Sequence, residues 1–185
     1  MGLSLRLLTL VLLLALVAFF AASEFALMRL RPTRVQELAE RGNAAALAVA
    51  RLQRHLRRAL LATQLGLSLA LLALGWGSHS LLTLLHGPTP PAWLQLVVFA
   101  VLALLATLLG GLLPKAWVLD DPENAALRLG PLLESVNQAL APLLSAIEAV
   151  ANVLLRAFGL PLQWDRLVPS LSASELESLI ENDAV

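Results

Sequence analysis

Cysteine is absent from the 185 residues, and histidine is scarce. Without cysteine the chain has no disulfide, thiol nucleophile or thiolate metal site, which leaves oxygen atoms as the ligands for any cation. The three histidines, His55, His79 and His86, lie on different segments, and no nucleophile motif or phosphate-binding loop accompanies them. The sequence therefore argues against an enzyme.

Charge is absent from residues 61–114, where no Asp, Glu, Lys or Arg occurs. At about 1.5 Å of rise per residue this apolar stretch is long enough to cross about 30 Å of hydrocarbon twice. Residues 86–91, with three prolines, divide it, and residues 7–23 form a third uncharged segment. Together with a composition that is 58% hydrophobic and only 14% charged, this predicts an all-α membrane protein with three transmembrane helices, at residues 5–28, 59–85 and 92–114.

Eight arginines in residues 29–58 give the predicted topology its orientation, because only Arg6 precedes the first span. The positive-inside rule places residues 29–58 and the C-terminal part in the cytoplasm and the N-terminus outside, which predicts a multi-pass protein of the cell (inner) membrane. A cleaved secretory signal ending at Ala21-Ala22-Ser23 is the competing interpretation, but it would leave the arginines outside. We expect the arginines to reach lipid headgroups rather than nucleic acid, since no aromatic residues are interleaved with them.

Two helices are expected in the arginine-rich segment. The first begins at Pro32 and ends at Gly42 as a left-handed cap, and Asn43 caps a second that runs to Arg58 and continues into span two without a break. After residue 116 the chain is acidic, so this later segment is a candidate to pair with the arginines. Together these features predict a cytoplasmic juxtamembrane helical hairpin.

Residues 131–159 repeat apolar positions at three- and four-residue steps, which predicts amphipathic belt helices broken near Pro142. A fourth full span is the alternative for this region. Residues 1–160 thus form the predicted transmembrane domain with its juxtamembrane helices. Residues 161–185 are expected to be a linker, and Ser172 to Glu175 have the spacing of a capping box.

Polar residues near the first two spans are candidates for a functional site. Ser23 and Glu24 lie at the inner end of span one, while Gln64 and Ser68 share one face of span two. Local backbone bonding of Ser23, an interfacial ion pair of Glu24 and helix packing at Gly66 are the structural alternatives. We expect the polar patches of all three spans to lie at one depth.

The end of span three carries Gly110, Gly111, Pro114 and Lys115. Pro114 has no N–H, so the carbonyl of Gly110 is expected to lose its helical partner. Carbonyls freed at membrane depth are good ligands for a hard cation such as Mg²⁺. A kink at the membrane boundary is the structural alternative.

Five motifs, in order along the chain, resemble the transmembrane domain of the CorC/cyclin M (CNNM) family. They are Ala22 to Leu27, Arg34 to Asn43, Ala62 to Gly66, Leu113 to Lys115 and Asn124 after Asp121-Pro122-Glu123. The resemblance implies a homodimer that exports Mg²⁺, with Na⁺ as a candidate exchange ion, and a linker that leads to cytoplasmic regulatory (CBS-like) domains.

The resemblance also implies a cation site between the spans, but this chain departs from the family pattern in three respects. Gly111 stands where the third-span motif has Glu, Ala21 stands where family members often have Ser, and Leu67 and Leu71 stand where some members have Asn. The metal candidates are therefore Ser23, Glu24, Gln64, Ser68, Gly110 and Gly111, with gating or kink roles for Gly66, Pro114 and Lys115. A membrane anchor that only dimerises a regulatory protein is the alternative function.

Overall fold

The computed structural model describes residues 2–159, and all regular secondary structure in that range is helical. The elements are α1 (Leu3–Arg29), α2 (Pro32–Glu40), α3 (Ala44–Arg54), α4 (Leu56–His86), α5 (Ala92–Leu105), the π-helical segment η1 (Ala106–Leu112), α6 (Leu113–Asp120), α7 (Pro122–Ala139) and α8 (Ala141–Ala157). This confirms the predicted all-α fold class. The predicted linker, residues 161–185, lies outside the described residues.

Three helices are long and apolar enough to cross a membrane, as the sequence predicts: Leu3–Arg29, Leu56–His86 and Ala92–Asp120. A fourth candidate among the described residues arises only if α7 and α8 are counted together. Helix α7 ends at Ala139 with Leu140 as its C-cap, so the chain breaks close to Pro142, as expected. The chain is thus a multi-pass membrane protein.

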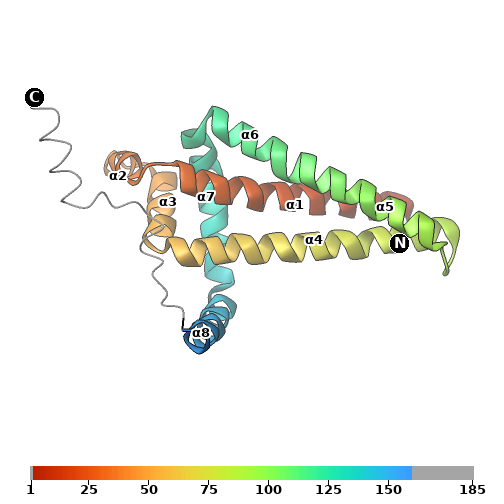
Figure 1. Ribbon diagram of the computed structural model, residues 1–185. Coiled ribbons are helices and arrows are strands. Elements are labelled where there is room, and N and C mark those ends of the chain that lie inside the picture. Colours follow the sequence, from red (N-terminus) through yellow and green to blue (C-terminus); the bar gives the residue numbers. More distant parts are fainter. Residues whose placement is uncertain (1, 160–185) are drawn as a thin grey trace, which may run out of the picture. The chain divides into compact units, whose positions relative to one another are not determined.

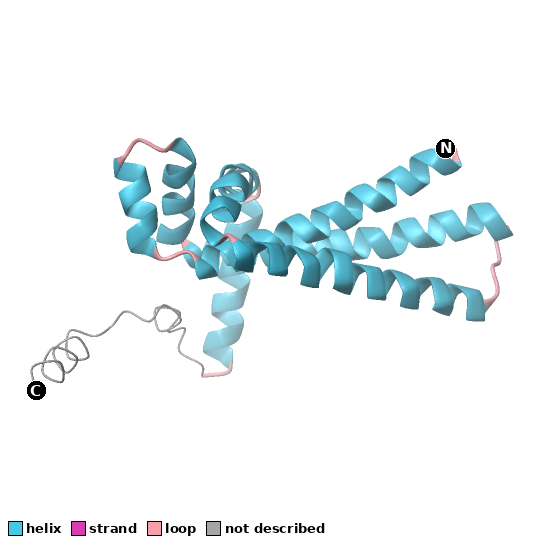
Figure 2. Ribbon diagram, turned by 90° about the horizontal axis from the view of Figure 1, so that it is seen from above, coloured by secondary structure: helices cyan, strands magenta, loops and turns pink. Residues whose placement is uncertain are grey.

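The chain divides into two compact units, residues 1–144 and 145–185, and the first holds the three spans. Within it α1, α4 and α5–η1–α6 run lengthwise, while α2, α3 and α7 lie at one end (Figure 1). The N-terminus and the turn between α4 and α5 lie at the opposite end (Figure 2). We call these the α7 end and the hairpin end.

Helix α1 is the centre of this unit, because α4, η1, α6 and α7 all pack against it. Two glycines permit the close approach of its neighbours. A Cβ on Gly66 of α4 would lie 2.2 Å from the Phe20 ring, and one on Gly110 of η1 would lie 2.6 Å from Val17. The interhelical seams of α1 thus depend on positions without a side chain.

The α2–α3 hairpin forms where local chemistry predicts it. Pro32 occupies the first turn of α2, Gly42 has φ of 83°, and the Asn43 side chain accepts hydrogen bonds from the backbone N–H groups of Ala45 and Ala46. The left-handed glycine ends one helix and the asparagine satisfies the free donors of the next.

The predicted unbroken passage from α3 into span two is wrong, because His55 interrupts it with φ of −120° and ψ of 45°. The buried face of α3, with Val49 and Leu52, packs against α7, whereas α4 packs against α1. A single straight helix cannot lie on both partners, and the break at His55 lets each half bury its own face.

Candidate functional site

Ser23 lies on α1 at the α7 end and is 1% exposed. Its Oγ has no hydrogen-bond partner among the described residues, so the common bond from a helical serine to its own backbone is not made. It borders a void between α1 and α7 that is too small for a water molecule, whose lining also includes Ala26, Ala126 and Gly130. A buried hydroxyl left unbonded costs about 1–3 kcal/mol, so this position is a candidate for a ligand contact.

Glu24, the next residue, faces α4 instead. The Thr63 hydroxyl lies 3.4 Å from Glu24 Oε2 and 2.8 Å from the backbone oxygen of Leu60. One hydroxyl has one proton, and the shorter contact is the stronger candidate to hold it. The half-buried Glu24 carboxylate therefore keeps acceptor capacity for a cation, while Arg29 lies over the Phe25 ring, 5.4 Å from its centroid.

Gln64 and Ser68 share a face of α4, but that face is exposed on the single chain. The face that packs on α1 carries Thr63 and Gly66. The structure therefore brings Glu24 together with Thr63, and it does not bring Gln64 or Ser68 into the same cluster. The amide of Gln64 and the hydroxyl of Ser68 lie on an otherwise apolar surface, where a polar partner outside this chain would stabilise them.

Gly110 and Gly111 have different surroundings although they are neighbours. Gly110 is buried against Val17, whereas a Cβ on Gly111 would meet only the backbone oxygen of Ala106, at 3.8 Å. Gly110 thus serves close packing, and Gly111 has room for a side chain. An acidic residue would fit at Gly111 without a clash at its Cβ.

The helix continues past Pro114 to Asp120 because the preceding segment widens into the π-helix η1. The N–H of Leu113 bonds to the carbonyl of Leu108, five residues back. In this register the carbonyl that lacks a partner because of Pro114 would be that of Leu109, one residue before the expected Gly110. Lys115 is exposed on α6.

The expected common depth of the polar patches holds for α1 and α4 but not for Gly110. The contact between Glu24 and Thr63 sets Gln64 at the level of Ser23. Gly110 is opposite Val17, and six residues of helix between Val17 and Ser23 correspond to about 9 Å. Gly110 therefore lies closer to the hairpin end than Ser23 does.

Ion pairs fix the helices around this site, and they join the arginine-rich hairpin to the acidic α7 as the sequence suggests. Arg51 of α3 binds Glu134 of α7 in a bidentate pair, and Arg34 of α2 binds Glu123 at 2.9 Å. The hydrogen bond from Arg51 holds the pKa of the Glu134 carboxyl below its ordinary value, despite the opposing effect of burial. Because α7 packs over Ser23, these ion pairs stabilise the position of α7 at the site.

The start of α7 has its own acidic cap. The Asp121 side chain accepts a hydrogen bond from the backbone N–H of Asn124 at 3.0 Å, and this bond lowers the pKa of Asp121. A negative charge at a helix N-terminus is also favoured by the helix dipole. The turn from α6 into α7 is thereby fixed next to the third span.

Sequence reasoning missed Thr63 and the α7 residues that cover Ser23. The signal was present in the spacing of small residues on span two, since Ala59, Thr63, Gly66 and Ala70 recur at three- and four-residue steps and all are buried. That stripe, rather than the polar pair Gln64 and Ser68, identifies the face toward α1.

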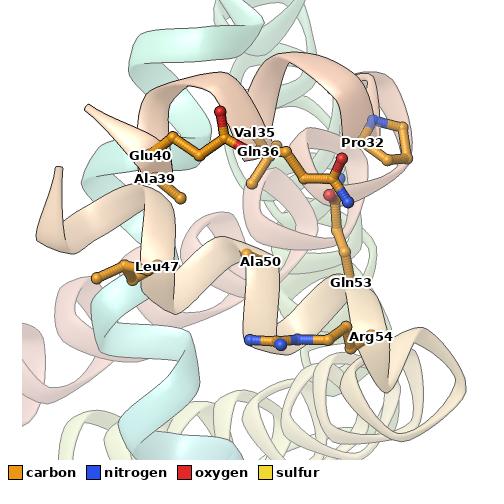
Figure 3. A pocket seen from close by; sticks show the side chains of 9 residues that line it. All are labelled: Pro32, Val35, Gln36, Ala39, Glu40, Leu47, Ala50, Gln53 and Arg54. Carbon is orange, nitrogen blue, oxygen red and sulfur yellow. The ribbon is translucent and has the colours of Figure 1, made fainter. Parts of the chain in front are cut away.

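A cavity of about 490 Å³ separates α2 from α3 (Figure 3). Its floor is apolar, with Val35 and Ala50, and Gln36 and Gln53 extend toward each other across it. The Gln53 amide donates to the backbone oxygen of Leu30 at 2.9 Å, which ties α3 to the end of α1. Glu40 is the carboxylate in this lining, so the cavity offers few ligands to a metal ion.

No cluster of three or more His, Cys, Asp or Glu side chains that could hold a metal occurs in residues 2–159. A cation in this part of the chain would therefore depend on hydroxyl, amide and backbone oxygens with Glu24 as the nearest carboxylate. Such a site would hold Mg²⁺ weakly, because that ion dehydrates reluctantly and prefers octahedral oxygen ligands.

Comparison with known proteins gives consistent matches. A family profile described as the cyclin M transmembrane N-terminal domain matches residues 7–184. The chain is 34% identical to the uncharacterised protein Rv1841c of Mycobacterium tuberculosis over 169 residues, which covers 88% of this chain and 49% of the relative. It is 33% identical to the UPF0053 protein YhdP of Bacillus subtilis over 162 residues, covering 80% of this chain and 36% of the relative. The chain therefore spans about a third to a half of the length of these relatives.

Proposed function

Because the chain belongs to the cyclin M transmembrane-domain family, we propose that it is the membrane part of a divalent-cation transporter that exports Mg²⁺. The observation that carries the proposal is the buried Ser23 hydroxyl without a partner, next to the Glu24 carboxylate at the α7 end of α1. A hydroxyl and a carboxylate on consecutive residues are oxygen ligands of the kind that a hard cation takes.

The third span contributes a helical irregularity that packs on α1. A π-helical segment is an uncommon and often functional irregularity, and η1 packs directly on α1. The backbone oxygens next to Pro114 supply further candidate ligands, and a shift between π and α register would move them relative to Ser23. Gly111 leaves this site without the carboxylate of the family motif, which favours low affinity.

A homodimer is part of the proposal. The exposed pair Gln64 and Ser68 needs a polar partner within the membrane, and a second copy of the chain offers the same pair. The arginine-rich α7 end faces the cytoplasm in this arrangement, so that the C-terminal part is cytoplasmic and the N-terminus is outside. Exchange against Na⁺ is the coupling to be tested.

The second candidate function is a membrane anchor that dimerises a cytoplasmic regulatory part. It is favoured by the void beside Ser23, which admits no water, and by the lack of an acidic cluster in the described residues. On this interpretation Ser23 and Glu24 are packing residues, and ion flux does not depend on them.

Mg²⁺ flux in proteoliposomes tests the proposal. We expect a Mg²⁺ gradient to drive dye-detected flux above empty vesicles, and Ser23→Ala and Glu24→Gln each to reduce it by about tenfold or more, as loss of a ligand does. Ser135→Ala, on the exposed face of α7, is the matched control and should leave flux unchanged. Flux no higher than that of empty vesicles in every variant, with or without opposing Na⁺, would support the anchor, whereas equal flux above that level in all variants would contradict the assignment of the site to Ser23 and Glu24.

A further inference from the structure

A second cavity, of about 350 Å³, lies between α3 and α7 beside the break at His55. This volume is within the range of small-molecule sites in proteins. All of its lining side chains except Leu52 are polar: Arg51, Arg54, His55, Glu134, Asn137 and Gln138. Neither the cation site nor the packing of α1 uses this cavity.

The lining carries two arginines and one carboxylate, so it has a net charge of +1 when His55 is taken as neutral. Glu134 is the carboxylate of the lining, and it is already bound by both nitrogens of the Arg51 fork and by the amide of Gln138 at 3.3 Å. Arg54 is exposed and lines this cavity as well as the larger one between α2 and α3 (Figure 3). Its guanidinium supplies the excess positive charge of the lining, and guanidinium groups bind phosphate oxygens in a bidentate manner.

Asn137 supplies an independent observation. Its Oδ1 is buried and has no hydrogen-bond partner among the described residues. Leaving a buried acceptor unpaired is unfavourable, so a ligand that donates a hydrogen bond to Asn137 would be stabilised by this contact. The amide relieves the cost either by accepting from a small donor or by turning, which exchanges the positions of its oxygen and nitrogen.

The position of the cavity selects the source of the phosphate. His55 immediately precedes α4, a candidate membrane span, so the proposed topology places the cavity near the membrane boundary. Helix α7, which supplies Asn137, also exposes Leu132, as a helix lying in the lipid interface does. Basic pockets at the cytoplasmic ends of spans are suited to lipid headgroups.

We propose that this cavity binds the headgroup of an anionic glycerophospholipid, with its phosphate at Arg54 and a headgroup hydroxyl at Asn137. Phosphatidylglycerol has both groups and is the probe of choice. Arg58 has a separate role, since it donates to the backbone oxygen of Ala141 at 2.6 Å and braces α4 against the end of α7. The inference is independent of transport, because it concerns neither Ser23 nor Glu24.

Native mass spectrometry of the whole chain, released from detergent with phosphatidylglycerol or phosphatidylcholine, tests the proposal. We expect phosphatidylglycerol to bind in preference to phosphatidylcholine and Arg54→Gln to reduce its bound fraction about threefold or more, the loss of a charge-assisted contact. Arg41→Gln, which removes the same charge from the exposed end of α2, should leave the bound fraction unchanged. Equal losses in the two arginine variants would overturn the proposal in favour of general attraction to anionic lipid.

Asn137→Leu separates ligand binding from folding. It removes an unpaired buried oxygen, so thermal stability without lipid should be unchanged or higher. The same variant should lose the preference for phosphatidylglycerol. If it binds this lipid like the wild type, the proposed site is wrong. The same measurement is repeated with inorganic phosphate. If free phosphate binds in an Arg54-dependent way and phosphatidylglycerol is not preferred over phosphatidylcholine, the ligand is not a lipid.

Discussion

The second and third spans differ in how deeply they are buried, and their hydropathies alone would suggest the opposite order of burial. The third is the more apolar, with a mean hydropathy of 2.8 against 1.7, yet only 6% of its most apolar window is buried against 33% for the second. Helix α5 has no buried residue, while α4 buries eight. A span that meets lipid needs apolar side chains all round, whereas a span that meets other helices needs small and polar ones. The low hydropathy of α4 thus accompanies its packing. The corresponding window of α1 is 28% buried at a mean hydropathy of 2.6, so a high hydropathy does not exclude packing, and α1 with α4 forms the frame of the bundle.

Gly66→Ala should produce the largest effect on this frame. The added Cβ would lie 2.2 Å from a Phe20 ring that is 5% exposed, so the helices must separate, at a cost of about 3 kcal/mol in the free energy of unfolding. Gly75→Ala on the same helix meets nothing within 4 Å and is the matched control, expected to be neutral or stabilising. Thermal unfolding in detergent measures both. Equal effects would mean that the α1–α4 seam is not tightly packed.

Leucine truncations compare the two spans directly. Leu74→Ala removes a side chain that is 3% exposed on α4 and should cost about 2 kcal/mol, the low end for buried leucines because the unfolded helix stays in detergent. Leu104→Ala, at 58% exposure on α5, should change stability by less than about 0.5 kcal/mol. A large loss from Leu104→Ala would show that a second copy packs on the third span.

Glu134→Gln tests how strongly the ion pair with Arg51 stabilises the packing of α7 over Ser23. We expect a loss of about 1 kcal/mol, since Glu134 is 12% exposed but its partner Arg51 is half exposed. The pKa of Glu134 is lower in the folded protein than its ordinary value of about 4.5. The ion pair therefore contributes fully to the free energy of unfolding above about pH 4.5, and this contribution is lost as the pH falls through the pKa of the folded state. The stability gap between wild type and variant should therefore close in acid. A gap that persists at low pH would assign the effect to packing.

Asn43→Ala should have the smallest effect, about 0.5–1 kcal/mol, because it removes the side-chain cap of α3 outside the spans. Asn43→Asp keeps the acceptor and is the control. Circular dichroism during thermal unfolding compares the two. Equal destabilisation by both substitutions would show that the cap bonds do not stabilise α3.

Local chemistry was sufficient to predict some elements and not others. Gly42 and Asn43 act on their own backbone, so the hairpin could be predicted without its partners. The break at His55 could not, because residues 44–58 favour helix throughout and the break is imposed by packing on two different helices. The π-helical register before Pro114 was likewise not predicted, and Gly110 within it packs against Val17 of α1.

For the candidate site, the sequence predicted the ligand residues on α1 but not the residues that they face. The motif around Ser23 and Glu24 could be identified from the residue types, because polar groups in a span are costly. Their partners could not, since the direction of each side chain depends on helix rotation. Ser23 turns toward α7 and Glu24 toward Thr63, although the two are adjacent in sequence.

Mg²⁺ binding to the purified chain tests the central proposal most directly. The melting temperature should rise with Mg²⁺ concentration as a bound ligand requires, and Ser23→Ala and Glu24→Gln should each abolish the rise while Ser135→Ala retains it. A K⁺ series at matched ionic strength controls for screening. An identical rise in all variants, or a rise reproduced by K⁺, would contradict a cation site at the α7 end of α1.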